Sequence, residues 1–258
     1  MDYIEKLANY KRNVLKILED GEFNYKGIIY PKKYILPINQ ADKNIMIDKS
    51  EYKYLSSNTI ELNKKFDEKP IKLSLHRYWY HLNSSQILAL NYFFDFLNDK
   101  KKLNHLLEFF QIKERAVEAT LEYEMHDKSE IDVAIKLENG KFVFIEVKYS
   151  ESEFGPASNK KTDYASRKEQ YYSSVGISYH NFIRHYQFVR NIILGVFGNY
   201  SVFLVPKFNR SITTDYNKSL NTISNFDNFD VRLVFWEDLL DFIKNADVNE
   251  KYFTGITE

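Results

Sequence analysis

The pattern of hydrophobic and polar positions predicts both helices and strands along this chain. Apolar residues recur at helical spacing over residues 1–19. They recur again over residues 179–197, which we expect to form one long helix. Between these two regions, residues 22–83 carry short β-like runs at 27–35 and 50–62, with no recognisable chemistry.

The pattern becomes sharper from Ser84 onward. Ser84 or Ser85 suits the N-cap of a helix that reaches Leu97, and a second helix is expected over about 101–112. Alternating apolar and polar residues predict a strand over 117–123, and the apolar run over 200–206 predicts a buried strand. The expected strands cover 117–123, 131–137, 142–149, 200–206 and 231–235, and a final helix covers 236–244. Strands followed by alternating helix and strand predict an α/β fold with a mixed central sheet.

Composition narrows the class of protein. The 258 residues include 36 basic and 36 acidic side chains, so the net charge indicates neither a nucleic-acid nor a membrane partner. The absence of cysteine excludes disulfides, thiolate metal sites and a cysteine nucleophile. No apolar stretch approaches the ~20 residues that span a bilayer, and the N-terminus lacks a signal core. We therefore expect a cytoplasmic protein without a membrane partner.

The candidate chemistry lies in the hairpin predicted over 131–149. Glu146 and Lys148 are two residues apart on one strand, so they project from the same face, and Asp132 lies near the start of the partner strand. Two carboxylates that converge with an amine can hold a hard divalent cation such as Mg²⁺ and position a water for attack on a phosphate.

The geometry of the turn decides whether these side chains meet. A two-residue Asn-Gly turn would place Asp132 opposite Val147, on the wrong face. A three-residue turn over 138–140, with Gly140 in the left-handed conformation, places Asp132 directly opposite Glu146. We predict the three-residue turn or an equivalent bulge nearer Asp132.

The alternative interpretation is a solvated sheet face with cross-strand ion pairs. The tripeptide acid-x-Lys is weak evidence by itself, because it also occurs at Glu51, Asp67 and Asp99. Only the copy at Glu146 lies in an apolar strand, where placing an acid and a lysine on one face is costly.

The array of Asp132, 13 intervening residues and then Glu-x-Lys on a strand–turn–strand resembles the PD-(D/E)XK nuclease superfamily, which has the restriction-endonuclease-like fold. More narrowly, five segments resemble a poorly characterised bacterial branch of it, and the similarity runs from about Ser84 to Lys244. The segments are Ser84-Ser85-Gln86, Leu121-Glu122-Tyr123, Ile145-Glu146-Val147-Lys148-Tyr149-Ser150-Glu151, Gln187-Phe188-Val189-Arg190-Asn191 and Val234-Phe235-Trp236-Glu237-Asp238-Leu239-Leu240.

The resemblance implies phosphodiester hydrolysis that depends on Mg²⁺, with Mn²⁺ as a substitute. Asp132 and Glu146 would be metal ligands, Lys148 would assist the nucleophilic water, and Glu122 would be a further acidic ligand or an exposed strand carboxylate. The proline of the motif is replaced by Ile131, as is frequent in the superfamily. We expect a restriction-endonuclease-like core over residues 84–258, with a mixed sheet flanked by helices, and an N-terminal α+β extension over residues 1–83.

The charge is unevenly distributed along the chain. Residues 156–190 contain six basic and two acidic residues, a net charge of +4, and are the expected nucleic-acid surface. Gln187 could orient a phosphate or a water, or lie on an ordinary solvent face. The candidate nucleic-acid-binding residues are Lys160, Lys161, Arg167, Lys168, Arg184 and Gln187.

The leading hypothesis is a Mg²⁺-dependent DNA endonuclease that acts in restriction, defence or repair. One site per chain favours a homodimer or sequential nicking for cutting both strands. A nuclease for RNA shares the same two-carboxylate chemistry and stays open. The alternative from another class is a non-catalytic nucleic-acid or protein-interaction module that retains the fold. Clustered carboxylates argue against that module, because they repel nucleic acid unless a cation lies between them.

Overall fold

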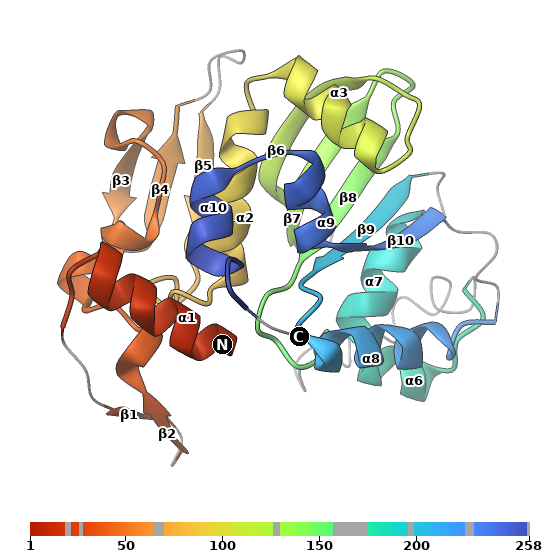
Figure 1. The fold of residues 1–258 in the computed structure, drawn as a ribbon. Helices are drawn as coiled ribbons and strands as arrows, with labels where there is room; N and C mark the ends of the chain where they lie inside the picture. Colours follow the sequence, from red (N-terminus) through yellow and green to blue (C-terminus); the bar gives the residue numbers. More distant parts are fainter. Residues whose placement is uncertain are drawn as a thin grey trace.

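The centre of the molecule is a five-stranded mixed sheet in the order β10-β9-β8-β7-β6 (Figure 1). The computed structural model describes residues 1–18, 22–25, 28–63, 70–125, 130–156, 175–195, 199–224 and 230–256. Neighbouring strands are antiparallel from β6 to β8 and parallel from β8 to β10. The strands are β6 (Ala116–Glu124), β7 (Glu130–Leu137), β8 (Phe142–Val147), β9 (Tyr200–Val205) and β10 (Asp230–Phe235). The predicted α/β class with a mixed central sheet is confirmed.

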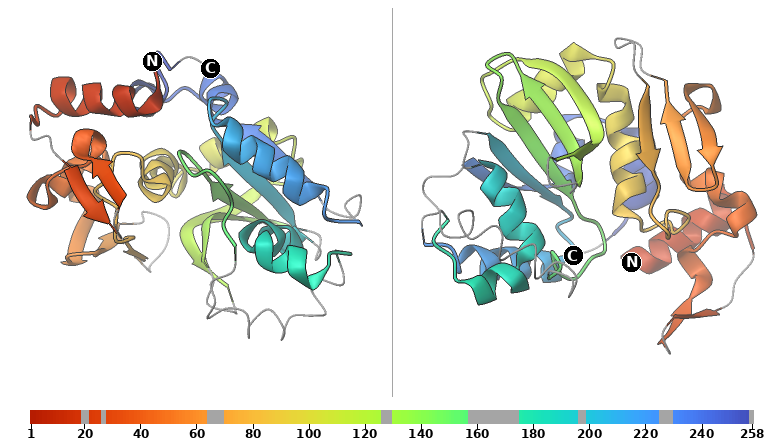
Figure 2. Two further views of the ribbon diagram at one scale, coloured as in Figure 1. Left: turned by 90° about the horizontal axis from the view of Figure 1, so that it is seen from below. Right: turned by 180° about the vertical axis from the view of Figure 1, so that it is seen from behind.

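Helices cover both faces of this sheet (Figure 2). Odd-numbered residues of the central hairpin, such as Val133 and Ile145, belong to the main core with α2 (Ser85–Phe93), α3 (Lys100–Phe109), α9 (Trp236–Phe242) and α10 (Ala246–Tyr252). On the other face, Phe203 and Val205 of β9 pack against α7 (Tyr186–Gly195) and α8 (Arg210–Leu220). On the even-numbered face of β7 and β8, Ala134 and Phe144 form a third hydrophobic cluster with Ile131, and Asp132 and Glu146 lie farther from the turn than this cluster.

The N-terminal third carries a second, antiparallel sheet in the order β3-β4-β5. Leu7 and Leu62 share one hydrophobic core with Trp236 and Tyr252 from the other end of the chain. The elements are α1 (Tyr3–Asn9), a π-helical turn (Tyr10–Val14), β1 (Glu22–Tyr25), β2 (Ile28–Pro31), β3 (Tyr52–Ser56), β4 (Thr59–Leu62), β5 (Ile71–Ser74) and 3₁₀ turns at Lys32–Tyr34, Ile38–Asn44 and Lys49–Glu51. A further 3₁₀ turn, Phe94–Phe96, follows α2. The division of the chain into 1–83 and 84–258 stays a prediction.

The single helix predicted over 179–197 is wrong. The segment forms α6 (Tyr179–Arg184) and α7, separated by His185 with φ −109° and ψ 35°. The ring nitrogen Nδ1 of His185 lies 2.7 Å from the hydroxyl of Ser219 on α8, so a tertiary contact fixes the break. Residues 196 and 197 lie outside the described residues. In the described part of the chain, no helix combines the length and apolar character needed to cross a membrane.

Candidate active site

The β7–β8 hairpin has the three-residue turn that the sequence predicted. Gly140 has φ +82° and donates its N–H to the carbonyl of Leu137 at 3.0 Å. The ladder pairs Lys136 with Phe142 and continues to Val133 with Ile145. The ladder ends there, and the next pair in the same register would be Asp132 with Glu146; both side chains line one cavity, so the geometric condition for the site is met.

The two carboxylates and the lysine line one cavity of about 700 Å³. Glu146 and Lys148 are only 6% and 8% exposed, respectively. The structure therefore excludes a freely solvated face of surface ion pairs as the setting of Glu146 and Lys148, and Asp132 is half-buried. Burying charge at this density is costly unless the groups are paired.

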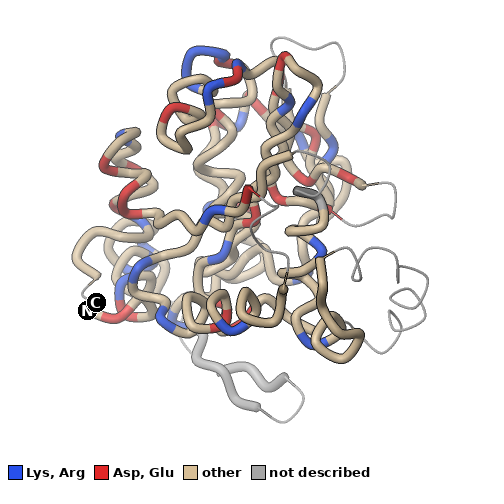
Figure 3. The backbone as a smooth tube through the Cα atoms, turned by 90° about the vertical axis from the view of Figure 1, so that its right-hand side faces the viewer, with Lys and Arg blue, Asp and Glu red and all other residues tan. Residues whose placement is uncertain are grey.

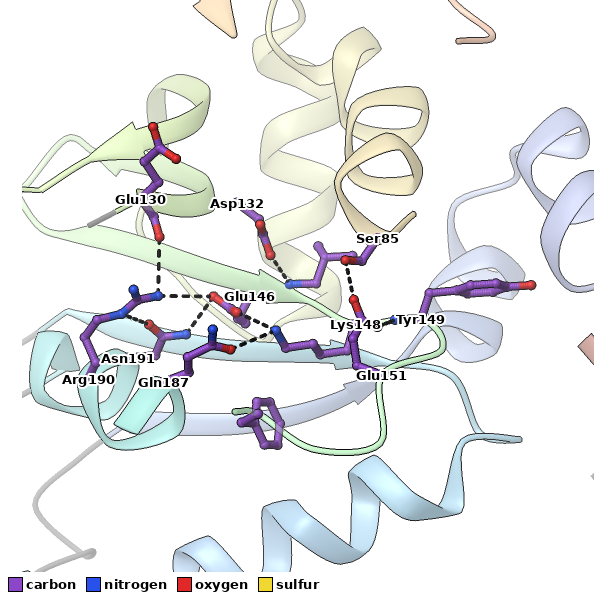
Figure 4. A network of polar contacts seen from close by, with 12 residues as sticks. Ser85, Glu130, Asp132, Glu146, Lys148, Tyr149, Glu151, Gln187, Arg190 and Asn191 are labelled. Atoms are coloured by element: carbon purple, nitrogen blue, oxygen red, sulfur yellow. Dashed lines mark hydrogen bonds and ion pairs between the residues drawn. The ribbon is translucent and has the colours of Figure 1, made fainter. Parts of the chain in front are cut away.

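Glu146 is held from both sides (Figure 4). Its Oε1 lies 2.9 Å from Lys148 Nζ, and its Oε2 accepts a hydrogen bond of 2.8 Å from Asn191 Nδ2. Arg190 Nη2 lies 3.8 Å from the same Oε2. Burial alone would raise the pKa of Glu146, but the Lys148 ammonium, assisted by Arg190, holds that pKa below its usual value. Glu146 is therefore a carboxylate at neutral pH.

Asp132 lies in the opposite electrostatic situation. Its Oδ2 accepts a hydrogen bond of 2.7 Å from the backbone N–H of Val147, which fastens it to the end of β8. Burial, followed by the nearby charges of Glu146 and Glu122, raises the pKa of Asp132 well above its usual value. Two facing carboxylates with opposite pKa shifts are typical of a site that shares a proton or a cation.

Lys148 is a cation in this site. Burial lowers its pKa, but Glu146, Glu151 and Asp132 together outweigh burial and raise it above the usual value. Its Nζ also donates to Gln187 Oε1 at 3.3 Å. Gln187 thus lines the carboxylate cavity and contacts the amine of Lys148, whereas the sequence left open whether it lies on a solvent face.

Glu122 lines the same cavity from β6. Its φ of +48° is a left-handed conformation, which costs ~1–3 kcal/mol in a non-glycine residue and is concentrated at functional sites. Its Oε1 accepts a hydrogen bond of 3.1 Å from Gln86 Nε2. Burial, with contributions from Glu130 and Glu146, raises the pKa of Glu122 to about 7.

The residues fit a hard divalent cation. Among the described residues, no three Asp, Glu or His side chains already have the spacing of a metal site. Mg²⁺ is often held by one or two carboxylates and completes its shell with water and substrate phosphate. Asp132 and Glu146 supply such a pair, and a cation between them would relieve the repulsion that raises the pKa of Asp132.

Residues without a role in the sequence analysis fix the end of β8. Glu151 accepts from the hydroxyl of Ser85 at 2.5 Å and from the backbone N–H of Tyr149 at 2.7 Å. Asn209 Nδ2 donates to the carbonyls of Tyr149 and Glu151 at 3.0 and 2.8 Å. Ser85, Glu151 and Asn191 all lie in the segments that carry the family resemblance, which was the available signal.

The predicted nucleic-acid-binding residues have different outcomes. Lys160, Lys161, Arg167 and Lys168 lie outside the described residues. Arg184, at the end of α6, is exposed and lines a separate cavity. Gln187 lines the carboxylate cavity itself.

One family model matches this chain. It is REase-ARP, described as "Restriction Endonuclease associating with ARP", and it matches residues 5–254. No curated protein matches the sequence. The match spans nearly the whole chain, including the N-terminal third, for which the sequence offered no resemblance.

Proposed function

This chain belongs to the restriction-endonuclease family REase-ARP, and from that premise we propose that it is a metal-dependent DNA endonuclease of the PD-(D/E)XK type. The family supports a nuclease, and the mixed α/β sheet is consistent with a restriction-endonuclease-like fold. The observation that carries the finer proposal is the convergence of Asp132, Glu146 and Lys148 on one cavity at the end of the β7–β8 hairpin.

The roles follow from the contacts. Asp132 and Glu146 would hold Mg²⁺ or Mn²⁺, with Glu122 as a further acidic ligand. When bound, the cation would activate a water and stabilise charge on the phosphate. Lys148, whose Nζ lies 2.9 Å from Glu146 Oε1, would orient the water and offset the charge that develops on the phosphate. Asn191 would orient the Glu146 carboxylate through its hydrogen bond to Oε2.

The partners are part of the same proposal. We propose DNA as the substrate. The cleavage experiment below compares DNA with RNA. The family description names association with ARP, so we propose that this chain also binds a partner protein. One site per chain favours a homodimer or sequential nicking for cutting both strands, and we place the protein in the cytoplasm.

The test is cleavage of plasmid DNA, single-stranded DNA and RNA with Mg²⁺ or Mn²⁺, and with a chelator. We expect metal-dependent cutting of DNA. Glu146→Gln and Asp132→Asn should each lower the rate by at least about a thousandfold, because each removes a charged ligand. Glu118→Gln is the matched control, because this half-exposed carboxylate of β6 contacts Lys136 outside the cavity.

Three results would contradict the proposal. Cutting that persists in chelator would contradict the dependence on a metal. Full activity in both variants would contradict the assignment of Asp132 and Glu146 as the catalytic site. An intact substrate with wild-type protein that also binds no metal would favour the non-catalytic interaction module.

A further inference from the structure

A second cavity, of about 500 Å³, lies next to the carboxylate cavity. The two cavities share Glu153 and Gly155, which belong to the chain segment that leaves β8. The second cavity is lined by residues of α6 and α8 as well as this segment. It is therefore placed to receive the part of a bound polymer that extends beyond the carboxylates.

Three cations line the second cavity: Arg184, Arg210 and Lys218. All three are exposed, and none forms an ion pair with another described residue. By contrast, Lys148 and Arg190 in the carboxylate cavity are both close to Glu146. The second cavity thus has the unpaired positive charge that the first cavity lacks.

Two carboxylates, Glu153 and Asp215, also line the second cavity, so its three cations exceed its acidic side chains by one charge. Asp215 accepts a hydrogen bond of 2.8 Å from the backbone N–H of Phe154 and lies 3.9 Å from His185. Glu153 lies on the segment that both cavities share. His185, Asp215 and Ser219 do not form a hydrolytic triad, because Asp215 and Ser219 approach the same ring nitrogen and Ser219 is fully buried.

We propose that the second cavity binds phosphates of the DNA backbone that flank the phosphate to be cut. This inference rests on the proposed function and adds Arg210 and Lys218 to its residues. Phosphate contacts fix the position of a nucleic acid without reading its sequence, and arginine and lysine supply them. Along the described chain, acidic and basic residues are interspersed (Figure 3), so attraction has to come from a local cluster of this kind.

The test compares wild-type protein with Arg210→Gln/Lys218→Gln in binding a fluorescent DNA duplex at several salt concentrations. We expect the double variant to bind on the order of tenfold more weakly. The slope of log affinity against log salt should fall by about two, since two phosphate contacts are lost. The rate of cutting at saturating DNA should change little, because neither residue lines the carboxylate cavity.

The matched control is Lys100→Gln/Lys101→Gln, which removes two exposed lysines of α3 at the opposite end of the molecule from α8 (Figure 1). This control should keep the wild-type affinity and slope. Equal losses in both double variants, or no loss in either, would overturn the inference while leaving the proposed function standing. A wild-type protein that neither binds nor cuts DNA would overturn both this inference and the proposed function. A change confined to the rate of cutting would also contradict a binding role.

Discussion

The carboxylate cavity and the second cavity lie side by side and divide the charges between them. In the carboxylate cavity, cations are paired and carboxylates are in excess, with Glu122, Asp132 and Glu146 together. In the second cavity, Arg184, Arg210 and Lys218 have no ion-pair partner among the described residues. An enzyme that cuts a polyanion needs both settings, because one attracts a cation and the other attracts phosphates.

Lys148 provides the sharpest contrast between the two cavities. We expect Lys148→Met to lower the rate of metal-dependent cutting by about a hundredfold, because the variant removes the charge next to the reacting phosphate. The DNA affinity of Lys148→Met should change little, whereas that of Arg210→Gln/Lys218→Gln should fall. Single-turnover cleavage and fluorescence anisotropy measure the two effects. A loss of affinity without a loss of rate would contradict the division between the cavities.

Asn191 tests the support of the Glu146 carboxylate. Asn191→Ala removes the buried Nδ2 group that donates a hydrogen bond to Glu146. This loss should lower the free energy of unfolding by about 1–3 kcal/mol and the rate of cutting by roughly tenfold. Chemical denaturation and cleavage measure these changes. Asn217→Ala, at an exposed position of α8, is the control and should alter neither. A stable and fully active Asn191→Ala would show that Asn191 does not position Glu146.

Gly155 lines both cavities. Of these variants, its replacement by alanine should have the smallest effect on the rate of cutting. Its φ is +83°, and an added Cβ would lie 3.4 Å from Gln187 Cδ. Gly155→Ala should cost about 1 kcal/mol of unfolding free energy from the backbone and lower the rate a few-fold through Gln187. Gly140→Ala is the matched control, with φ +82° and no heavy atom within 4 Å of the added Cβ. Thermal denaturation should show similar losses for both variants, whereas only Gly155→Ala should slow cutting. Equal rates of cutting in the two glycine variants would show that the contact of Gln187 with Lys148 does not affect cutting.

The hairpin could be predicted because local rules determine its register. The turn length and the alternation of β7 and β8 fix which face Asp132, Glu146 and Lys148 share. The break at His185 could not be predicted, because it depends on a contact with Ser219 more than thirty residues away. α8 was missed as well, since its sequence Arg-Ser-Ile-Thr-Thr-Asp-Tyr-Asn-Lys-Ser-Leu has few apolar residues to reveal a helical stripe.

The site could be predicted only in part, because several of its contacts depend on tertiary structure. Glu122 was a candidate from the sequence, but its left-handed backbone and its contact with Gln86 depend on tertiary structure. Asn191 lay in a segment that carries the family resemblance, yet only the fold shows that it is buried against Glu146. Arg210 and Lys218 lay outside the basic segment of the sequence and join Arg184 only through the packing of α8 beside α6 and α7.

The central claim is that Asp132 and Glu146 bind one divalent cation. Calorimetric titration of Mn²⁺ into wild-type protein, Asp132→Asn and Glu118→Gln tests it most directly. The account predicts one binding site in wild-type protein and in Glu118→Gln, and its loss in Asp132→Asn with the fold retained by circular dichroism. Equal Mn²⁺ binding by all three proteins, or none by the wild type, would contradict it.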